Sequence, residues 1–209
     1  METTRYLRKL ADQGCADAQF RLGYRLAFGR NRPQPIDWKS VFSLWKAAAM
    51  QGHVRAQFYT GTCFDWGRGT KRNEKAAMCW YWMAAQQGHT ASKYNLAFGY
   101  REGEGVKKSY VKARDWYLSA AIDGDPDSQR DLGVLLHEGR GGKRNDVAAA
   151  YWYRKAARAG DAKAQFNLGL CHLEGHGVAK STRSSRHWFR RAARQGHEGA
   201  IEQLRRVDG

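Results

Sequence analysis

The chain has 209 residues, of which 42% are hydrophobic and 27% are charged, and its formal net charge is +16. A charge this positive favours an acidic partner, which includes an acidic protein surface, nucleic acid or an anionic membrane. No apolar run is long enough to cross a bilayer, and the opening METTRYLRKLADQG lacks the apolar core of a secretory signal. We therefore expect a cytoplasmic chain without a membrane span, or a secreted or periplasmic one if the natural N-terminus has been trimmed.

The first predicted element is a helix over residues 3–13, within an N-terminal cap at residues 1–14. Tyr6 in this helix stands where later units have tryptophan. Five helix–turn–helix units are expected next, at residues 15–52, 53–88, 89–124, 125–160 and 161–196, followed by a C-terminal cap helix within 197–209. The first unit is two residues longer, and its loop at 29–36 carries basic residues and prolines where later units have a G-x-G turn.

The units are defined by residues that recur at a period of 36. A period in this range indicates a repeat array. In the second helix of each unit, Leu44 or a tryptophan precedes an alanine pair by four or five residues, so these side chains share a face that we expect to be packed. In the first helix a small residue, usually glycine, follows the column leucine and is expected to let the second helix approach closely.

The predicted helix ends rest on capping residues that recur with the same period. The recurring glycine of each unit suits the left-handed position after a helix, and the next residue can begin the following helix. The second helices should begin at Asp37, Asn73, Ser109, Asn145 and Ser181. The expected helix pairs are 53–66 with 73–87, 89–102 with 109–123, 125–138 with 145–159, and 161–174 with 181–195, and the last helix is expected at 198–207.

The pattern A-x-A-x-x-x-L-G…G-x-G-V…K-A…W-x-x-K-A-A-x-x-G, clearest in residues 90–124 and 162–196, resembles the Sel1-like repeat. That family is a branch of the tetratricopeptide-like solenoids. The resemblance implies an all-α fold: a right-handed α/α superhelical solenoid of five Sel1-like repeats with terminal capping helices. The regular columns leave no room for a linker, so we expect residues 1–209 to form a single domain.

The four cysteines are Cys15, Cys63, Cys79 and Cys171. Some secreted Sel1-like proteins carry a cysteine pair in every repeat, and this chain does not. Cys63 and Cys171 share one column three repeats apart, too far for a disulfide. Cys63 and Cys79 lie in one repeat, where they could approach or pack separately. This usage favours a reducing compartment.

Two motifs that suggest chemistry are better explained by the repeat. Glycine-rich turns such as Gly175–Gly177 resemble phosphate cradles, but they recur in every unit after the first and no strand precedes them. His172 and His176 with the adjacent Cys171 could form a metal site, but His176 lies in a turn where helical spacing has ended. No nucleophile has an evident base partner. We predict a non-enzyme with no cofactor and no metal.

The resemblance also implies a partner-binding groove, because the first helices of tetratricopeptide-like solenoids line a concave face. The inward positions lie two residues to either side of the column leucine and in the turn beyond it. They are Phe20, Tyr24, Phe58, Trp66, Tyr94, Phe98, Arg101, Arg130, His137 and Phe166. Aromatic residues with arginines are typical of peptide hot spots. The alternative is that the aromatic residues are ordinary packing residues.

A basic patch is predicted on the outer face of the last two second helices. Its residues are Arg154, Lys155, Arg158, Arg186, Arg190, Arg191 and Arg194. Residues 162–197 hold seven basic side chains against one acidic one. A run of charges is usually a solvated face, but arginine binds carboxylates and phosphates bidentately, so its concentration in the last unit moves the interpretation somewhat toward a binding site.

The leading prediction is a non-catalytic protein–protein interaction scaffold or adaptor. It would bind an acidic partner through the aromatic–basic groove and the basic patch. The resemblance supports this, because Sel1-like proteins are adaptors in signalling, secretion, envelope and virulence pathways, mostly in bacteria. One alternative is a nucleic-acid-binding basic solenoid, which the net charge supports. Another is a dedicated inhibitor or immunity-type partner of one toxin or enzyme.

Overall fold

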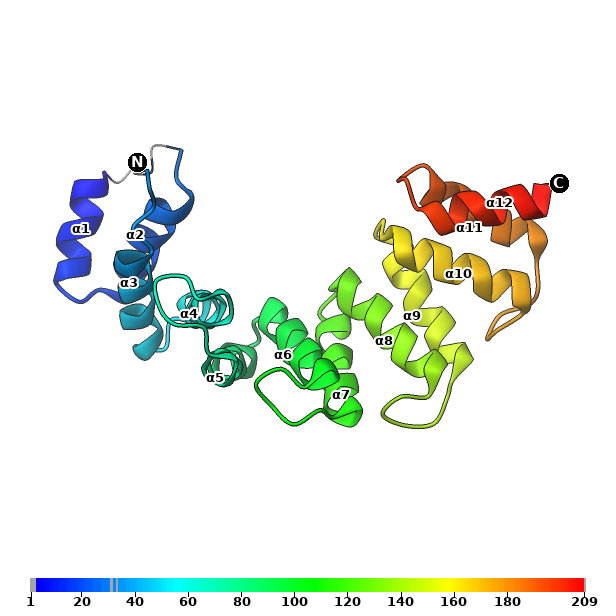
Figure 1. Cartoon of the computed structure of the whole chain (residues 1–209), viewed down its shortest axis with the longest axis horizontal. Coiled ribbons are helices and arrows are strands. Elements are labelled where there is room, and N and C mark those ends of the chain that lie inside the picture. The colour runs from blue at the N-terminus through cyan, green and yellow to red at the C-terminus, as the bar shows by residue number, and fades with distance from the viewer. Residues whose placement is uncertain (1–2, 31, 33, 209) are drawn as a thin grey trace. The chain divides into compact units, whose positions relative to one another are not determined.

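The structure is a computed structural model that describes residues 3–30, 32 and 34–208 (Figure 1). This part of the chain is all-helical, with twelve helices and no strand. The helices are α1 Thr4–Asp12, α2 Ala16–Phe28, α3 Trp38–Met50, α4 Val54–Trp66, α5 Glu74–Gln86, α6 Thr90–Glu102, α7 Tyr110–Ile122, α8 Pro126–Glu138, α9 Asp146–Arg158, α10 Ala162–Glu174, α11 Thr182–Ala193 and α12 Glu198–Asp208. The loop predicted to interrupt the first unit includes Asn31 and Pro33, which lie outside the described residues.

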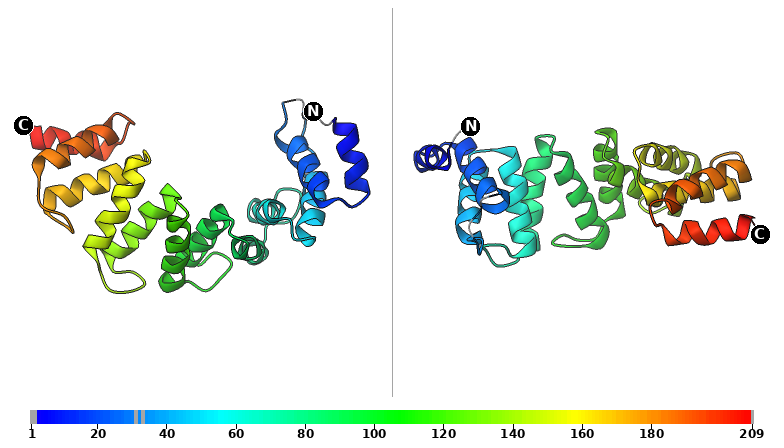
Figure 2. Two further views of the ribbon diagram at one scale, coloured as in Figure 1. Left: turned by 180° about the vertical axis from the view of Figure 1, so that it is seen from behind. Right: turned by 90° about the horizontal axis from the view of Figure 1, so that it is seen from above.

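The chain divides into two compact units, each larger than a single helix–turn–helix repeat. The first unit is residues 1–108 and the second unit is residues 109–209. In the first unit, α1 to α6 pack in chain order, each helix against the next. In the second unit, α7 to α12 do the same. The two further views agree that consecutive helices lie side by side within each unit (Figure 2). Each unit is therefore a run of stacked helical hairpins, which is the architecture expected of an α/α solenoid.

The predicted helix boundaries are confirmed, and the reason is the capping chemistry. The Asn73 side chain accepts a hydrogen bond from the Ala76 N–H at 3.0 Å, and the Asn145 side chain accepts one from Ala148 at 2.9 Å. Asp37, Ser109 and Ser181 cap their helices in the same way. These bonds satisfy N–H groups that have no partner within the helix, so the cap position fixes where each second helix begins.

The buried aromatic column of the second helices lies one residue after the predicted one. Trp45, Tyr81, Tyr117, Tyr153 and Phe189 are at most 3% exposed, whereas the tryptophans at 80, 116, 152 and 188 are only partly buried. The alanine pairs are packed as expected, with Ala156 and Ala157 fully buried. Each alanine pair lies four and five residues after its tryptophan, and therefore three and four residues after the aromatic residue that follows the tryptophan. That aromatic residue shares a helix face with the alanines and faces the first helix more directly.

The small residue of the first helix allows the close approach that the sequence predicts. A Cβ atom at Gly61 would lie 2.7 Å from the Tyr81 ring, and one at Gly169 would lie 2.5 Å from the Phe189 ring. No side chain fits at such distances, so glycine sets the separation of the two helices in these hairpins.

Glutamines join successive hairpins. The Gln165 amide donates to the Ala157 carbonyl at 3.1 Å, and its oxygen accepts from Gln195 at 3.0 Å. In the first unit Gln57 bonds the Ala49 carbonyl at 3.3 Å and accepts from Gln87 at 2.8 Å. These bonds give a further donor to carbonyl groups at helix ends, since the Ala49 and Ala157 carbonyls also accept from the N–H groups of Gly52 and Gly160.

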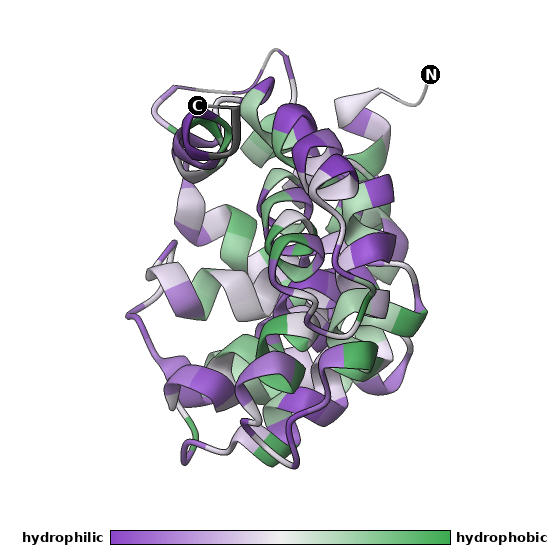
Figure 3. Ribbon diagram, turned by 90° about the vertical axis from the view of Figure 1, so that its right-hand side faces the viewer, coloured by the Kyte–Doolittle hydropathy of each residue, from purple (hydrophilic) through white to green (hydrophobic). Residues whose placement is uncertain are grey.

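Most helices carry both apolar and polar residues, so each of these helices has a packed side and a side that faces solvent (Figure 3). The last helix shows this clearly, because Ala200 is fully buried while Glu202, Arg205 and Arg206 are exposed. Glu202 forms an i,i+4 ion pair with Arg206 at 3.0 Å. The structure therefore agrees with a capping role for α12.

Candidate binding surfaces

Three of the predicted groove aromatics pack against the rings of histidines that cap the next hairpin, two of them stacked and one, Phe58, tilted. The pairs are Phe20–His53, Phe58–His89 and Phe166–His197, with ring centroids 4.6, 4.7 and 4.6 Å apart. Phe20 is also covered by the guanidinium of Arg55 at 4.8 Å and is only 4% exposed. Phe20 therefore belongs to the core, which corrects its prediction as an accessible groove residue. Phe58 and Phe166 are half-buried by the same ring contacts.

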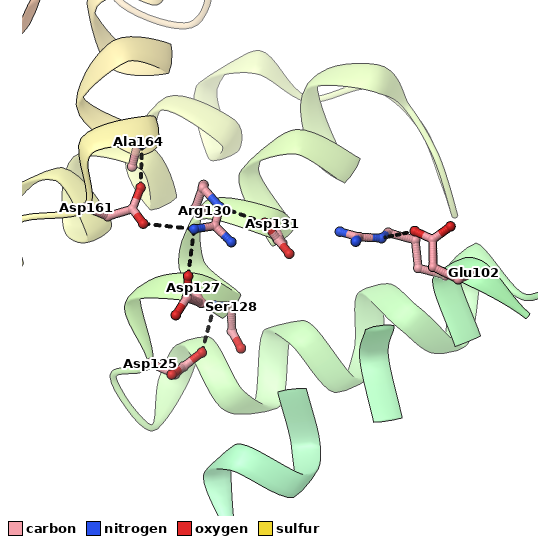
Figure 4. Close-up of polar contacts among 9 residues, drawn as sticks. Glu102, Asp125, Asp127, Ser128, Arg130, Asp131, Asp161 and Ala164 are labelled. Atoms are coloured by element: carbon pink, nitrogen blue, oxygen red, sulfur yellow. Dashed lines mark hydrogen bonds and ion pairs between the residues drawn. The ribbon is translucent and has the colours of Figure 1, made fainter. Parts of the chain in front are cut away.

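Arg130 occupies the equivalent position in the fourth repeat, where it holds carboxylates (Figure 4). Its guanidinium contacts Asp127 at 2.6 Å, Asp131 at 2.7 Å and Asp161 at 2.8 Å. The hydrogen bonds to Asp131 and Asp127 raise the pKa of Arg130 further above its ordinary value, although burial opposes them. Arg130 is thus an internal structural cation, and we exclude it from the surfaces proposed below.

The aromatic residues near the end of α2 form an accessible cluster in the first unit. Tyr24 is 39% exposed and meets Phe28 edge-on at 5.0 Å and Tyr59 at 5.8 Å. The guanidinium of Arg55 lies 5.7 Å from the Tyr24 ring. Phe28 and Tyr59 were not among the predicted groove residues.

A cavity of about 500 Å³ opens between α4, α5 and α6, and we call it the aromatic–acidic cavity. It brings together the predicted groove residues Trp66, Tyr94 and Phe98. Its other lining residues are Thr62, Asp65, Arg72, Glu74, Ala77, Met78, Tyr81, Asn95, Gly99 and Glu104. Trp66 is 71% exposed, so its ring is available at the rim.

The polar part of this cavity is negatively charged. Arg72 is paired with Glu74 at 2.7 Å, and Asp65 accepts a hydrogen bond from the Tyr81 hydroxyl at 3.2 Å. Burial, followed by the charges of Asp65 and Glu74, raises the pKa of Glu104 above its ordinary value. Burial and the Asp65 carboxylate also raise the pKa of the Tyr81 hydroxyl. The lining thus holds three carboxylates, those of Asp65, Glu74 and Glu104, with one cation, Arg72, among them.

Arg101 and His137 have intramolecular partners near the ends of their helices. Arg101 forms an ion pair with Glu102 at 2.6 Å and lies 4.9 Å from the Phe98 ring. In the second unit the His137 ring contacts Asp146 at 2.8 Å and lies 5.4 Å from His176. Neither residue lines the aromatic–acidic cavity.

Part of the predicted basic patch lines one hollow of about 380 Å³ along α11. Its lining residues are Arg183, His187, Arg190, Arg191 and Arg194, and we call it the arginine hollow. Arg154, Lys155, Arg158 and Arg186 do not line it. On α9, the Lys155 ammonium instead lies 5.1 Å from the rings of both Tyr151 and Trp152. The arginine hollow is therefore built from one helix rather than across two repeats.

The histidines considered for a metal site have other partners. His176 contacts Glu174 at 3.0 Å, and the His172 ring lies 3.3 Å from the Ala179 carbonyl. Among the described residues, no group of three or more His, Cys, Asp or Glu side chains is placed to hold a metal ion. The four cysteines are free thiols. No helix in the described part of the chain is both long and apolar enough to cross a membrane.

The sequence analysis missed Asp65 and Glu104, and for Glu104 the repeat itself carries a signal. The predicted groove residue Trp66 stands in the column that holds Glu102, Glu138 and Glu174 in later repeats. Glu104 is the one acidic residue in a column that otherwise holds Arg68, Arg140 and His176. A residue whose type differs from the others in its repeat column does not share their packing role. Such differences indicate where the surface of one repeat has a role that the other repeats lack.

Comparison with known proteins gives a consistent family. The Sel1 repeat model matches residues 16–53, 54–89, 90–125, 126–161 and 162–197. A Sel1 repeat protein from Oxalobacter formigenes is 30% identical with a TM-score of 0.84, and the match covers 98% of this chain and 58% of that one. The protein c5321, a protective antigen of uropathogenic Escherichia coli, is 30% identical with a TM-score of 0.79 over 96% of this chain and 50% of that one.

A curated relative is the chitin synthase regulator SKT5 of Saccharomyces cerevisiae. It is 36% identical over 80 residues, which are 37% of this chain and 11% of that protein. This chain thus spans little more than half the length of the solved relatives and a small part of the yeast protein. Because the five matched repeats cover most of the sequence, the chain belongs to the Sel1 repeat family.

Proposed function

We propose that this chain is a non-catalytic scaffold that binds a protein partner, and that the arginine hollow of α11 receives an acidic segment of that partner. Sel1 repeat proteins generally mediate protein–protein interactions and are typically non-catalytic. The observation that carries the finer proposal is the convergence of four arginines and His187 on one hollow.

The spacing of these residues explains why they converge. Arg183, His187, Arg191 and Arg194 are separated by four, four and three residues, so they form one stripe along the helix. Among the described residues, Arg183, Arg191 and Arg194 form no ion pair with a carboxylate. The guanidinium of Arg191 lies 5.2 Å from the Trp188 ring, which holds it near the surface.

Carboxylates of a partner would provide the ion pairs that Arg183, Arg191 and Arg194 do not form within the described part of the chain. Guanidinium groups bind carboxylates bidentately, and several such groups in one hollow attract an acidic segment more strongly than scattered lysines would. The basic residues of α9, Arg154, Lys155 and Arg158, remain in the proposal as a second positive face that steers the encounter.

The test is capture of partners from native lysate, with and without nuclease, by wild type and two charge-reversal variants. Arg191→Glu with Arg194→Glu changes the arginine hollow, and Arg5→Glu with Arg8→Glu is the matched control. The control pair has the same spacing and charge change, and it lies on exposed positions of α1. Both pairs are surface substitutions, so we expect each variant to remain folded.

The proposal predicts protein partners that resist nuclease, disappear with the α11 variant and remain with the α1 variant. Retention of a single protein would identify a dedicated partner, such as the target of an inhibitor, whereas several would indicate an adaptor. Equal loss with both variants would show that only net charge matters, and would contradict the arginine hollow. Loss of all bound material after nuclease would replace the protein partner with nucleic acid.

A further inference from the structure

The aromatic–acidic cavity has a charge opposite to that of the chain as a whole. Asp65 and Glu104 both line it, and in the described part of the chain neither carboxylate forms an ion pair. The one cation that lines the cavity, Arg72, is paired with Glu74 at 2.7 Å. The cavity therefore carries two carboxylates that no cation pairs with, although the protein as a whole has a net charge of +16. A cationic ligand would neutralise this local negative charge.

We propose that the aromatic–acidic cavity binds an arginine side chain presented by a protein partner. Trp66, Tyr94 and Phe98 supply ring surfaces for the guanidinium, and Asp65 and Glu104 supply its acceptors. A volume of about 500 Å³ lies within the usual range for ligand pockets, so the cavity accommodates the side chain with adjoining backbone.

Arginine fits this lining better than lysine does. A guanidinium is planar and weakly hydrated, so it stacks on aromatic rings while its N–H groups bind carboxylates. The chain itself shows both contacts close by. Arg101 lies 4.9 Å from the Phe98 ring, and Arg72 binds the Glu74 carboxylate at the cavity wall. The partner's arginine would make the same two contacts inside the cavity.

The proposal rests on the proposed function only in that the ligand belongs to a protein. The cavity lies in the first unit and the arginine hollow in the second, and the two sites select opposite charges. A partner that used both would present an arginine to one and carboxylates to the other. Either site can fail experimentally without the other.

The experiment is a titration of the whole chain with N-acetyl-argininamide, followed by two-dimensional NMR. The reporter is the Trp66 indole N–H, assigned by comparison with Trp66→Phe. N-acetyl-citrullinamide, which has the same shape without the charge, is the ligand control, and N-acetyl-lysinamide compares the two cations. We expect saturable shifts at Trp66 and at backbone amides of Gly99 and Glu104, with argininamide binding most tightly.

Asp65→Asn with Glu104→Gln should weaken argininamide binding at least about tenfold, because charged hydrogen bonds are lost. Asparagine still offers an oxygen to the Tyr81 hydroxyl, so the local structure is retained. The matched control is Glu138→Gln with Glu174→Gln, which removes the same charge from the exposed last residues of α8 and α10 in the second unit. This control should bind as wild type does, and so should the arginine-hollow variant.

Three results would overturn the proposal. One is equal binding of citrullinamide and argininamide, because charge would then play no part. Another is undiminished binding after the Asp65 and Glu104 substitutions. The third is the absence of any saturable shift at Trp66. Normal argininamide binding together with failed partner capture would contradict the arginine hollow and leave this cavity standing.

Discussion

The Arg130 guanidinium lies 2.8 Å from the Asp161 carboxylate, across a separation of 31 residues. At the same separation the Phe58 ring packs against His89 and Phe166 stacks on His197. An ion pair in one repeat thus replaces an aromatic stack in others, at the junction between successive hairpins. In each case the second partner also caps the following helix through its side chain.

This equivalence predicts energetic coupling between positions 130 and 161. Arg130→Phe leaves the largely buried Asp161 carboxylate without its guanidinium, and Asp161→His removes one of the three carboxylates that the Arg130 guanidinium contacts, so we expect each to lower the free energy of unfolding by about 1–3 kcal/mol. Together they restore the stack found in other repeats, so the double variant should lose about 1–2 kcal/mol less than the sum. Urea unfolding of the four proteins measures this coupling.

A matched cycle on the exposed pair Glu138 and Arg140 provides the control. Their side chains are 38% and 51% exposed, so alanine substitutions should show coupling below about 1 kcal/mol. Strict additivity at positions 130 and 161 would contradict the proposed equivalence of ion pair and stack.

The close approach within each hairpin predicts that Gly169→Ala is destabilising. The added methyl group would meet the fully buried Phe189 ring at 2.5 Å, and overpacking of this kind costs about 1–3 kcal/mol. Phe189→Leu should partly relieve the clash, so the double variant should lose less than the two single losses combined. Thermal unfolding of these variants, with Gly199→Ala as comparison, tests this prediction. At Gly199 the nearest ring atom would be 3.3 Å away, and the substitution should be nearly neutral.

The sequence predicted the helices well because every repeat carries its own caps. Asn73, Asn145 and Ser181 mark helix starts by local chemistry, which depends on three or four neighbouring residues. The buried aromatic column was misplaced by one residue because Trp152 and Tyr153 are adjacent and both are plausible core residues. Only the direction of the neighbouring helix decides that Tyr153 is buried.

The candidate sites were harder to predict because they depend on contacts between helices. Arg130 was predicted as a groove residue from its position in the repeat and because arginine is typical of hot spots. The three aspartates that bind it come together only in the folded hairpins. Trp66 is a predicted groove residue and is exposed, but Asp65 and Glu104 lie 39 residues apart and share no column. Their common cavity follows from the packing of α4, α5 and α6.

The cysteines are predicted to fall into two reactivity classes. Cys63 and Cys171 are buried, and burial raises the pKa of their thiols to about 12 and about 11. Cys15 and Cys79 are exposed. Because the thiolate is the reactive form, a colorimetric disulfide reagent at pH 8 should modify two thiols rapidly and the other two only after unfolding. Cys15→Ser with Cys79→Ser should abolish the fast phase, and a persistent fast phase would contradict the burial of Cys63 and Cys171.

Argininamide binding to the aromatic–acidic cavity should weaken in acid. The pKa of Glu104 is raised by its burial and by Asp65, Glu74 and Glu102, while Arg72 opposes the shift. The ligand stays cationic, so affinity falls as pH drops through the Glu104 pKa and this carboxylate is neutralised. The fall should begin at a higher pH than an ordinary glutamate would give. NMR titrations at several pH values measure it, and a pH-independent affinity would exclude Glu104 as an acceptor.

The most direct test of the scaffold account is the kinetics of partner binding at low and moderate salt. With the captured partner immobilised, Arg191→Glu with Arg194→Glu should lower the association rate at least about tenfold at low salt, and should flatten its dependence on salt. The α1 control should retain the wild-type salt dependence. Wild-type association rates and salt dependence in the α11 variant would contradict the claim that the arginine hollow receives an acidic segment.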